Sequence, residues 1–120
     1  MDLTGKCKED FLNSIPITEE MLLCAYTERE ITSLIIEFFD SVGIIITISE
    51  DSFNHVDEDN NEDYWCSEFS YDVKRYTEIE NGLNDYSQYY NSESFKNRKE
   101  ATIQAIKKAN EIYNNLFLPK

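Results

Sequence analysis

The strongest pattern of apolar positions in this chain lies between Ile31 and Ser49. Its first part repeats every three or four residues and traces one face of a helix through Ile31, Leu34, Ile35, Phe38, Phe39 and Val42. Gly43 follows, and glycine readily takes the positive φ with which many helices end. The β-branched run Ile44–Ile48 then predicts a strand that folds back against this helix.

Shorter helices are predicted ahead of this stretch. Residues 10–14 suit a short helix that ends before Pro16, because the residue preceding a proline is pushed out of the α region. Thr18 is an expected N-cap, and residues 27–30 match a capping box. The pattern leaves open whether residues 18–42 form one kinked helix or two. The apolar side of the helix after Thr18 would consist of Met21, Leu22, Cys24 and Ala25.

Two further strands are predicted after a polar interval. Residues 50–63 are acidic and lack an apolar period, so we expect a solvated and mobile loop there. Apolar residues then return mostly at every second position, which predicts a strand over residues 64–76 that packs through Trp65, Phe69, Tyr71 and Val73. Asn81–Gly82 is a turn signal. A third strand is expected over residues 86–91, with packing residues Tyr86, Tyr89 and Tyr90.

The last element is predicted to be a helix that Asn97 caps, with Glu100 in its first turn. Its buried stripe would consist of Ala101, Ala105, Ile106, Ala109, Ile112, Tyr113 and Leu116. The charged side chains expected to face water are Lys99, Lys107, Lys108 and Glu111.

Together these elements predict an α+β fold in a single domain over residues 1–120. Helices come first, a three-stranded antiparallel sheet follows, and the C-terminal helix packs on the sheet. A chain of 120 residues is long enough to bury a core without disulfides or metals.

Cysteine usage and hydropathy indicate a cytoplasmic protein. Cys7, Cys24 and Cys66 are odd in number and far apart, which is typical of reduced thiols rather than of a disulfide framework. Neither a signal-peptide core nor an apolar run of transmembrane length is recognisable, so we expect no membrane association.

Charge changes the functional picture most. The formal net charge is −13, with 22 acidic and 5 basic side chains in residues 1–95, and 2 acidic and 6 basic ones in residues 96–120. A negative field repels phosphates and attracts basic surfaces, which argues against direct nucleic-acid binding and for a basic protein partner. Alternatively, the acidity serves solubility alone.

A calcium-loop register can be laid over the acidic segment, with ligand positions at Asp57, Asp59, Asn61, Asp63 and Glu68. Glu62, however, occupies the position where the sharp turn needs glycine, and strands rather than helices flank the segment. We therefore expect a solvated segment with no metal and no cofactor.

Catalytic signatures are absent from the sequence. His55 is the single histidine and lacks a recognisable nucleophile, and Cys66 lies among acids that disfavour a reactive thiolate. No P-loop, G-x-S-x-G, G-x-G-x-x-G or HExxH motif occurs. We expect that the protein is not an enzyme.

Tyrosines concentrate in the strand region. Alternation places Tyr64, Tyr76 and one of Tyr89 and Tyr90 on the sheet face away from the core, where aromatic residues among carboxylates suit a protein interface. The alternative is that residues 1–26 cover that face as a second layer. The predicted partner-binding residues are Asp57, Glu58, Asp59, Glu62, Asp63, Tyr64, Tyr76 and Tyr89.

Three segments carry a resemblance, FFDSVGIIITI, WCSEFSYDV and FKNRKEATIQAIKKANEIYNN. In them the chain resembles small orphan proteins of bacterial phages and mobile elements, some of which antagonise host defences as anti-CRISPR proteins do. The resemblance covers about two thirds of the chain and is one of pattern. It implies a short accessory protein and carries no site residues.

The function expected from these observations is inhibition without catalysis. The acidic domain would occupy the basic nucleic-acid channel of a host defence nuclease, such as an RNA-guided effector. One alternative is an immunity or antitoxin protein that neutralises a basic toxin. Another is an RNA-binding module that uses the last helix through Lys96, Arg98, Lys99, Lys107 and Lys108.

Overall fold

The computed structural model describes residues 2–57, 62–78 and 84–116; within the strands, positions 53–57, 62–66, 77–78 and 84–89 are described for the backbone alone. The helices are α1 (Gly5–Ser14), α2 (Glu19–Ala25), α3 (Glu28–Ser41) and α4 (Arg98–Leu116). The strands are β1 (Ile44–Asp57), β2 (Glu62–Glu78) and β3 (Asn84–Asn91). This element order confirms the predicted α+β fold. The expected Asn81–Gly82 turn lies outside the described residues.

Three of the helices begin at the predicted N-caps. The Thr18 hydroxyl accepts a hydrogen bond from the backbone of the first turn of α2 at 3.2 Å. Thr27 and Glu30 form the full capping box, with side chain and backbone bonded in both directions at 3.2 and 3.0 Å. Asn97 caps α4 at 2.7 Å. Because the cap at Thr27 has extended backbone, residues 18–42 form two helices rather than one.

Gly43 turns the chain from α3 into β1 with a φ of 83°. Its carbonyl accepts a hydrogen bond from the Tyr76 N–H at 2.8 Å. A Cβ at this position would lie 3.0 Å from the carbonyl oxygen of Tyr76. Glycine is therefore favoured both by the backbone conformation and by the close approach of β2.

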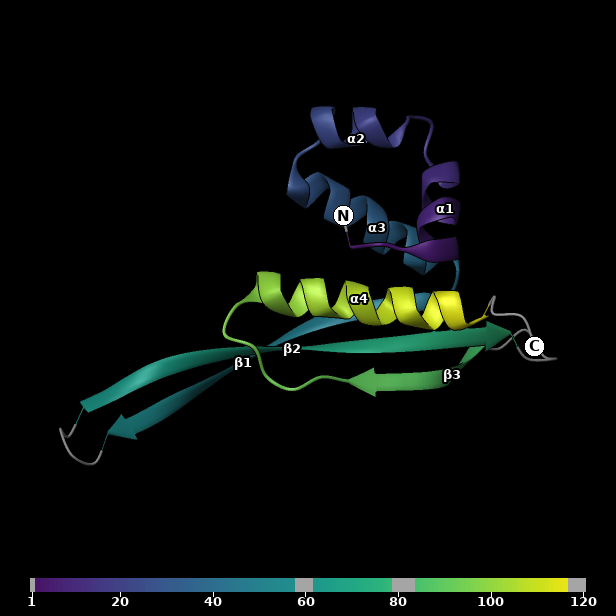
Figure 1. The fold of residues 1–120 in the computed structure, drawn as a ribbon. Coiled ribbons are helices and arrows are strands. Elements are labelled where there is room, and N and C mark those ends of the chain that lie inside the picture. Colours follow the sequence, from purple (N-terminus) through teal and green to yellow (C-terminus); the bar gives the residue numbers. More distant parts are fainter. Residues whose placement is uncertain (1, 58–61, 79–83, 117–120) are drawn as a thin grey trace.

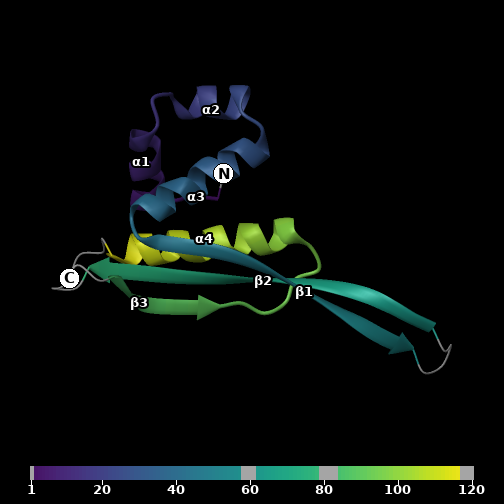
Figure 2. The same ribbon diagram turned by 180° about the vertical axis from the view of Figure 1, so that it is seen from behind.

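The three strands form an antiparallel meander in the order β1-β2-β3, as predicted. All four helices lie on one side of this sheet (Figure 1 and Figure 2), with α3 over β1 and α4 over β1 and β2. The alternative in which residues 1–26 cover the other face is wrong, because α1 packs on α3 and α4 instead.

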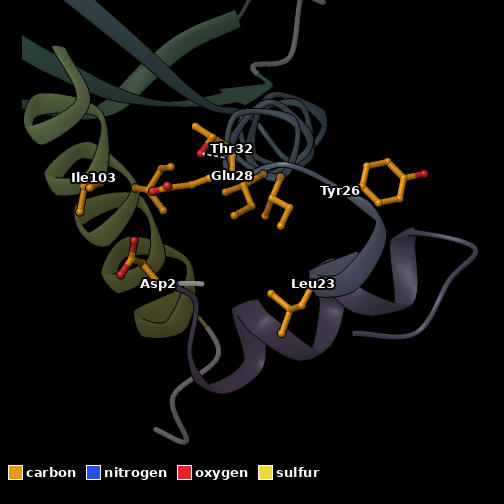
Figure 3. A pocket seen from close by; sticks show the side chains of 9 residues that line it. Asp2, Leu23, Tyr26, Glu28, Thr32 and Ile103 are labelled. Carbon is orange, nitrogen blue, oxygen red and sulfur yellow. Dashed lines mark hydrogen bonds between the residues drawn. The ribbon is translucent and has the colours of Figure 1, made fainter. Parts of the chain in front are cut away.

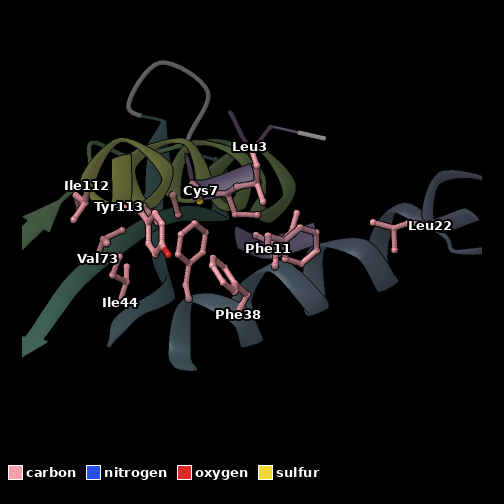
Figure 4. Close-up of a cluster of buried hydrophobic side chains, with 14 residues drawn as sticks. Leu3, Cys7, Phe11, Leu22, Phe38, Ile44, Val73, Ile112 and Tyr113 are labelled. Atoms are coloured by element: carbon pink, nitrogen blue, oxygen red, sulfur yellow. The ribbon is translucent and has the colours of Figure 1, made fainter. Parts of the chain in front are cut away.

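The core lies between the helices and the covered sheet face (Figure 4). Phe38 is central, with ring centroids 5.7 Å from Phe11 in an edge-on contact and 5.6 Å from Tyr113. The core residues are Leu3, Cys7, Phe11, Leu22, Ile35, Phe38, Phe39, Ile44, Val73, Ala105, Ile106, Ala109, Ile112 and Tyr113. Removal of this apolar surface from water is the main term that favours folding.

Polar contacts fasten the N-terminal segment to α4. The Asn110 side chain accepts a hydrogen bond from the Thr4 N–H at 2.9 Å and donates one to the Thr4 hydroxyl at 3.0 Å. The Asn114 amide donates to the Thr4 carbonyl at 3.0 Å. Also on α4, the Tyr113 hydroxyl donates a hydrogen bond to the Asp10 carboxylate of α1 at 2.5 Å. These contacts join segments more than a hundred residues apart in sequence.

Some residues that were predicted to be buried are exposed. Met21 is 55% exposed, Val42 40% and Leu116 42%. Leu22 is the only residue of α2 that reaches the core among the described positions, because α2 lies away from the sheet (Figure 1). Val42 follows the end of α3, and Leu116 closes the last turn of α4. At the helix ends the apolar period thus continues in the sequence, but the residues there are exposed.

Candidate functional site

A hairpin of two long strands projects from the helical body. We call its outer part, residues 50–57 and 62–69, the acidic arm. The arm extends past the first turn of α4 and past β3 (Figure 1). It contains no lysine or arginine, and its acidic residues are Glu50, Asp51, Asp57, Glu62, Asp63 and Glu68.

The prediction of a loop over residues 50–63 is wrong, since residues 50–57 are paired strand and pairing resumes at Glu62. The alternation that marks a strand in a sequence arises where one face is buried and the other solvated. Neither face of the arm lies beneath a helix (Figure 1 and Figure 2), so polar residues occupy both. Backbone hydrogen bonds to β2 therefore hold residues 50–57 in a strand that the apolar pattern did not predict.

The register sets acidic residues opposite one another along the arm. Asp51 faces Glu68 across the two strands, and Asp57 faces Glu62. The side chains of Asp51 and Glu68 are exposed. Like charges directly opposite in an antiparallel pair are destabilising. A cationic surface docked on the arm would turn this repulsion into attraction.

The predicted partner-binding residues do not form one cluster. Asp57, Glu62, Asp63 and Tyr64 are arm positions, whereas Glu58 and Asp59 lie outside the described residues. Tyr76 lies at the opposite end of β2, twelve residues beyond Tyr64, which corresponds to about 40 Å at roughly 3.3 Å per residue.

The tyrosines away from the arm belong to the body. Tyr76 is half-buried and its N–H bonds to Gly43. Tyr89 is a β3 position paired with Lys74. Tyr90, one of the two tyrosines considered for the outer face, packs against the core instead. The arm and these tyrosines are therefore separate surfaces.

The described residues of the proposed calcium-loop register belong to paired strands. In the part of the chain that the structure describes, no group of three or more His, Cys, Asp or Glu side chains is placed to hold a metal ion. The ligand register is divided between two paired strands, with Asp57 opposite Glu62 and Glu68 opposite Asp51. Asn61 lies outside the described residues. A hairpin thus replaces the helix–loop–helix frame that a calcium loop uses.

Groups with shifted pKa values have structural explanations. Burial raises the pKa of the Cys7 thiol to about 12, and the nearby Asp10 carboxylate adds to the shift. The hydrogen bond from Tyr113 lowers the pKa of Asp10, and the ion pair with Lys6 acts in the same direction. The backbone N–H of the α3 cap lowers the pKa of Glu30. These groups serve packing and capping, and none lines the cavities described below.

The cations of α4 already contact partners within the chain. Lys99 lies 3.4 Å from Glu28, and Arg98 lies 3.7 Å from Glu50 at the base of the arm. Lys108, predicted to face water, is half-buried with its ammonium 4.1 Å from the centre of the Tyr90 ring.

Of the four lysines named for RNA contact, Lys99 and Lys108 therefore have partners within the chain. Lys107 is exposed on the same helix. Ion pairs and ring contacts of this kind compete with phosphate binding, since the same cation must leave its partner first.

Two adjoining cavities open between α3 and α4. The smaller, of about 300 Å³, has walls of mixed polarity, whose apolar residues include Leu23 of α2, Tyr26 directly after α2 and Ile103 of α4 (Figure 3). The carboxylates of Asp2 and Glu28 also line it.

The larger cavity, of about 770 Å³, reaches from Ile48 of β1 to the cations Arg29, Arg98 and Lys99. Leu23 and Tyr26, which line the smaller cavity, are 53% and 38% exposed. The apolar pattern of α2 could not identify this concave surface, because an exposed leucine and a buried one look alike in sequence.

None of the helices among the described residues is long and apolar enough to cross a membrane. No protein-family model matches the chain, and searches of curated proteins and of solved structures find no significant match either.

Proposed function

We propose that this chain is a non-enzymatic inhibitor that binds the basic nucleic-acid-binding surface of a host defence nuclease, as anti-CRISPR proteins do. The acidic arm is the observation that supports the proposal most. It combines six carboxylates without a lysine or arginine and keeps two like-charge pairs across its strands. Lysines and arginines that normally bind phosphates would bind these carboxylates and relieve their repulsion.

The hairpin form of the arm strengthens this proposal. Carboxylates on a flexible loop would lose conformational entropy on binding, whereas strands hold them in place beforehand. Asp51 and Asp57 are six residues apart on one face of β1, or about 20 Å at roughly 3.3 Å per residue, and Glu68 and Glu62 are the positions opposite them. The arm would therefore present two preorganised pairs of negative charge. A cytoplasmic location suits both such a target and the reduced cysteines.

An immunity protein that neutralises a basic toxin would use the same arm and remains the second candidate. Direct RNA binding has less support, because Lys99 and Arg98 contact acidic residues of their own chain. The two protein-binding candidates differ in the partner rather than in the surface used.

Binding to a purified RNA-guided nuclease, measured with and without its target DNA, tests the proposal. Affinity should fall steeply between about 0.05 and about 0.5 M NaCl as charge pairs are screened, and target DNA should compete. The double variant Asp51→Asn/Glu68→Gln should bind about tenfold more weakly or worse, since it removes two arm charges.

The matched control is Glu20→Gln/Glu37→Gln, which removes two exposed charges from α2 and α3. It should bind like the wild type. Because Asp51 and Glu68 repel each other, the arm variant should not lose stability, and so weaker binding cannot be explained by unfolding. Binding that ignores both salt and the arm variant would refute electrostatic mimicry, and absence of binding would remove the nuclease as the target.

A further inference from the structure

The edge of the sheet formed by β1 is exposed from Glu50 to Ser52, although Ile44 at its start is buried. β1 pairs with β2 from Ile44 to Asp57 without a bulge and is the outermost strand of the sheet. It is 14 residues long, against about 5–6 for an ordinary strand. Proteins usually protect an edge with lysine, proline, a bulge or a short strand. Residues 44–57 contain no lysine, arginine or proline.

Hydrogen bonds at the start and in the middle of the ladder identify which backbone groups point to this edge. Tyr76 donates to the Gly43 carbonyl, so these two residues form a hydrogen-bonded pair. In an antiparallel ladder such pairs alternate with pairs whose backbone groups point away from each other. Along β1, even-numbered residues therefore direct N–H and C=O away from β2. Phe69 confirms the alternation: it lies opposite Glu50 and exchanges hydrogen bonds of 2.9 and 2.7 Å with Phe95 on its other side.

The outward groups at the base of the arm are unpaired. Within the described part of the chain, the backbone N–H groups of Ile48, Glu50 and Ser52 have no backbone partner outside the β1–β2 ladder and no side-chain acceptor. Glu50 and Ser52 are exposed. Water can satisfy such groups, and so can an added strand, which would gain a continuous ladder.

We infer that the free edge of β1 takes up an extended basic segment of the partner as a fourth strand. The inference rests on the proposed function and specifies how that partner is held. Backbone hydrogen bonds to Ile48, Glu50 and Ser52 supply the pairing, and the charge of exposed Asp51 selects lysine or arginine beside it. Glu50 adds to this negative charge, although it lies 3.7 Å from Arg98 of its own chain.

A second copy of this chain fits the same edge poorly. Glu50 and Asp51 lie at the middle of β1. Two β1 strands paired antiparallel through their outward, even-numbered residues at nearly full overlap would bring Glu50 opposite Glu50 or Asp51 opposite Asp51 of the other copy, and like charges directly opposite are destabilising. A cationic strand meets no such repulsion, which is why the charge pattern favours a foreign segment over self-association.

Residue-resolved hydrogen exchange with a synthetic probe tests the inference. The probe is a peptide of about ten residues that alternates lysine and threonine, a length that spans an ordinary strand. Binding should slow exchange of the Ile48, Glu50 and Ser52 amides at least tenfold while the already bonded amides of Ser49 and Asp51 change little. A peptide N-methylated at alternate residues keeps every charge and should lose this protection, because its donors are blocked.

A protein variant gives the complementary test. Ser52→Pro removes one outward N–H without removing a bond to β2, and should weaken peptide binding about tenfold. Ser52→Ala controls for the hydroxyl, which lies 3.4 Å from that of Ser67.

Equal binding of both peptides, without protection of the even-numbered amides, would overturn strand addition and leave the electrostatic proposal intact. Failure of the unmodified peptide to bind at low salt would also overturn strand addition. The proposed function is judged separately by the nuclease experiment with the Asp51→Asn/Glu68→Gln variant.

Discussion

Asn110 is the clearest case of a single side chain that joins distant parts of this protein. It is 9% exposed and meets the N–H and the hydroxyl of Thr4 through its own oxygen and nitrogen. A buried amide is costly unless it is hydrogen-bonded, so its place on the apolar side of α4 depends on Thr4. The N-terminal segment in turn brings Leu3 and Cys7 into the core.

Asn110→Ala should reduce the free energy of unfolding by about 1–3 kcal/mol, because Thr4 loses its partners. Urea denaturation followed by circular dichroism measures the change. Asn115→Ala is the matched control, since Asn115 is exposed on the same helix and its replacement should stay within about 0.5 kcal/mol. Equal effects of the two substitutions would contradict the role given to Asn110.

Tyr113→Phe should raise the pKa of Asp10, because the tyrosine hydroxyl is the main cause of its lowered value. A carboxyl with a lowered pKa stabilises the fold above its ordinary pKa of about 3.9, and this contribution disappears as the pH falls through the lower native pKa. The stability difference between wild type and variant should thus be full at neutral pH and shrink in acid.

Carboxyl-carbon NMR titration of Asp10 checks the shift, with denaturation at several pH values as the second readout. Tyr26→Phe removes a hydroxyl from an exposed tyrosine and should change neither. An Asp10 titration that is the same with and without the Tyr113 hydroxyl would rule out this coupling.

At the scale of elements, the joint between α3 and β1 decides where the sheet lies. α3 begins at the Thr27 cap, and Gly43 turns the chain from α3 into β1. The next residue, Ile44, is buried in the core. The same strand then continues beyond the helices as one side of the acidic arm. One element thus contributes to the core at its start and to the acidic arm at its end.

Gly43→Ala should destabilise the protein by about 1–2 kcal/mol, the usual cost of a left-handed conformation for a residue with a Cβ. The short contact with the Tyr76 carbonyl adds to that cost. Val42→Ala, at the exposed neighbouring position, controls for local sequence and should have a much smaller effect. Chemical denaturation that ranks the two variants in the opposite order would contradict this account of the joint.

For the whole molecule, repulsion from the excess negative charge should affect the stability more than the individual ion pairs do. The net charge is −13. The five ion pairs found among the described residues all involve partly or fully exposed side chains, and such pairs typically contribute about 0–1 kcal/mol each. Repulsion between the many carboxylates should therefore dominate the response of stability to salt.

Added NaCl should therefore raise the melting temperature, by roughly 3–5 °C for each 1 kcal/mol of repulsion removed in a domain of this size. Differential scanning calorimetry between low and moderate ionic strength measures the shift. The Asp51→Asn/Glu68→Gln variant, with two charges fewer, should respond less. A melting temperature that falls with salt would show that the ion pairs outweigh the repulsion.

Local signals in the sequence determined the starts of α2, α3 and α4, the turn at Gly43 and the strand faces that enter the core, whereas α1 begins at Gly5, ahead of the predicted residues 10–14. Thr18, Thr27 and Asn97 act as caps through bonds to residues three positions away, so their neighbours alone were sufficient. The same holds for Ile44 and Val73, since alternation marks a strand with one buried face.

Tertiary structure alone decided the acidic arm, the side of the sheet that the helices cover and the residues that helix ends leave exposed. The β1 side of the arm has no buried face, and so no apolar period distinguishes Asp51 or Asp57 from residues of a loop. Its strands exist because backbone groups distant in sequence pair with each other. The register that sets these carboxylates opposite Glu68 and Glu62, and opens the edge of β1, follows from that long-range pairing.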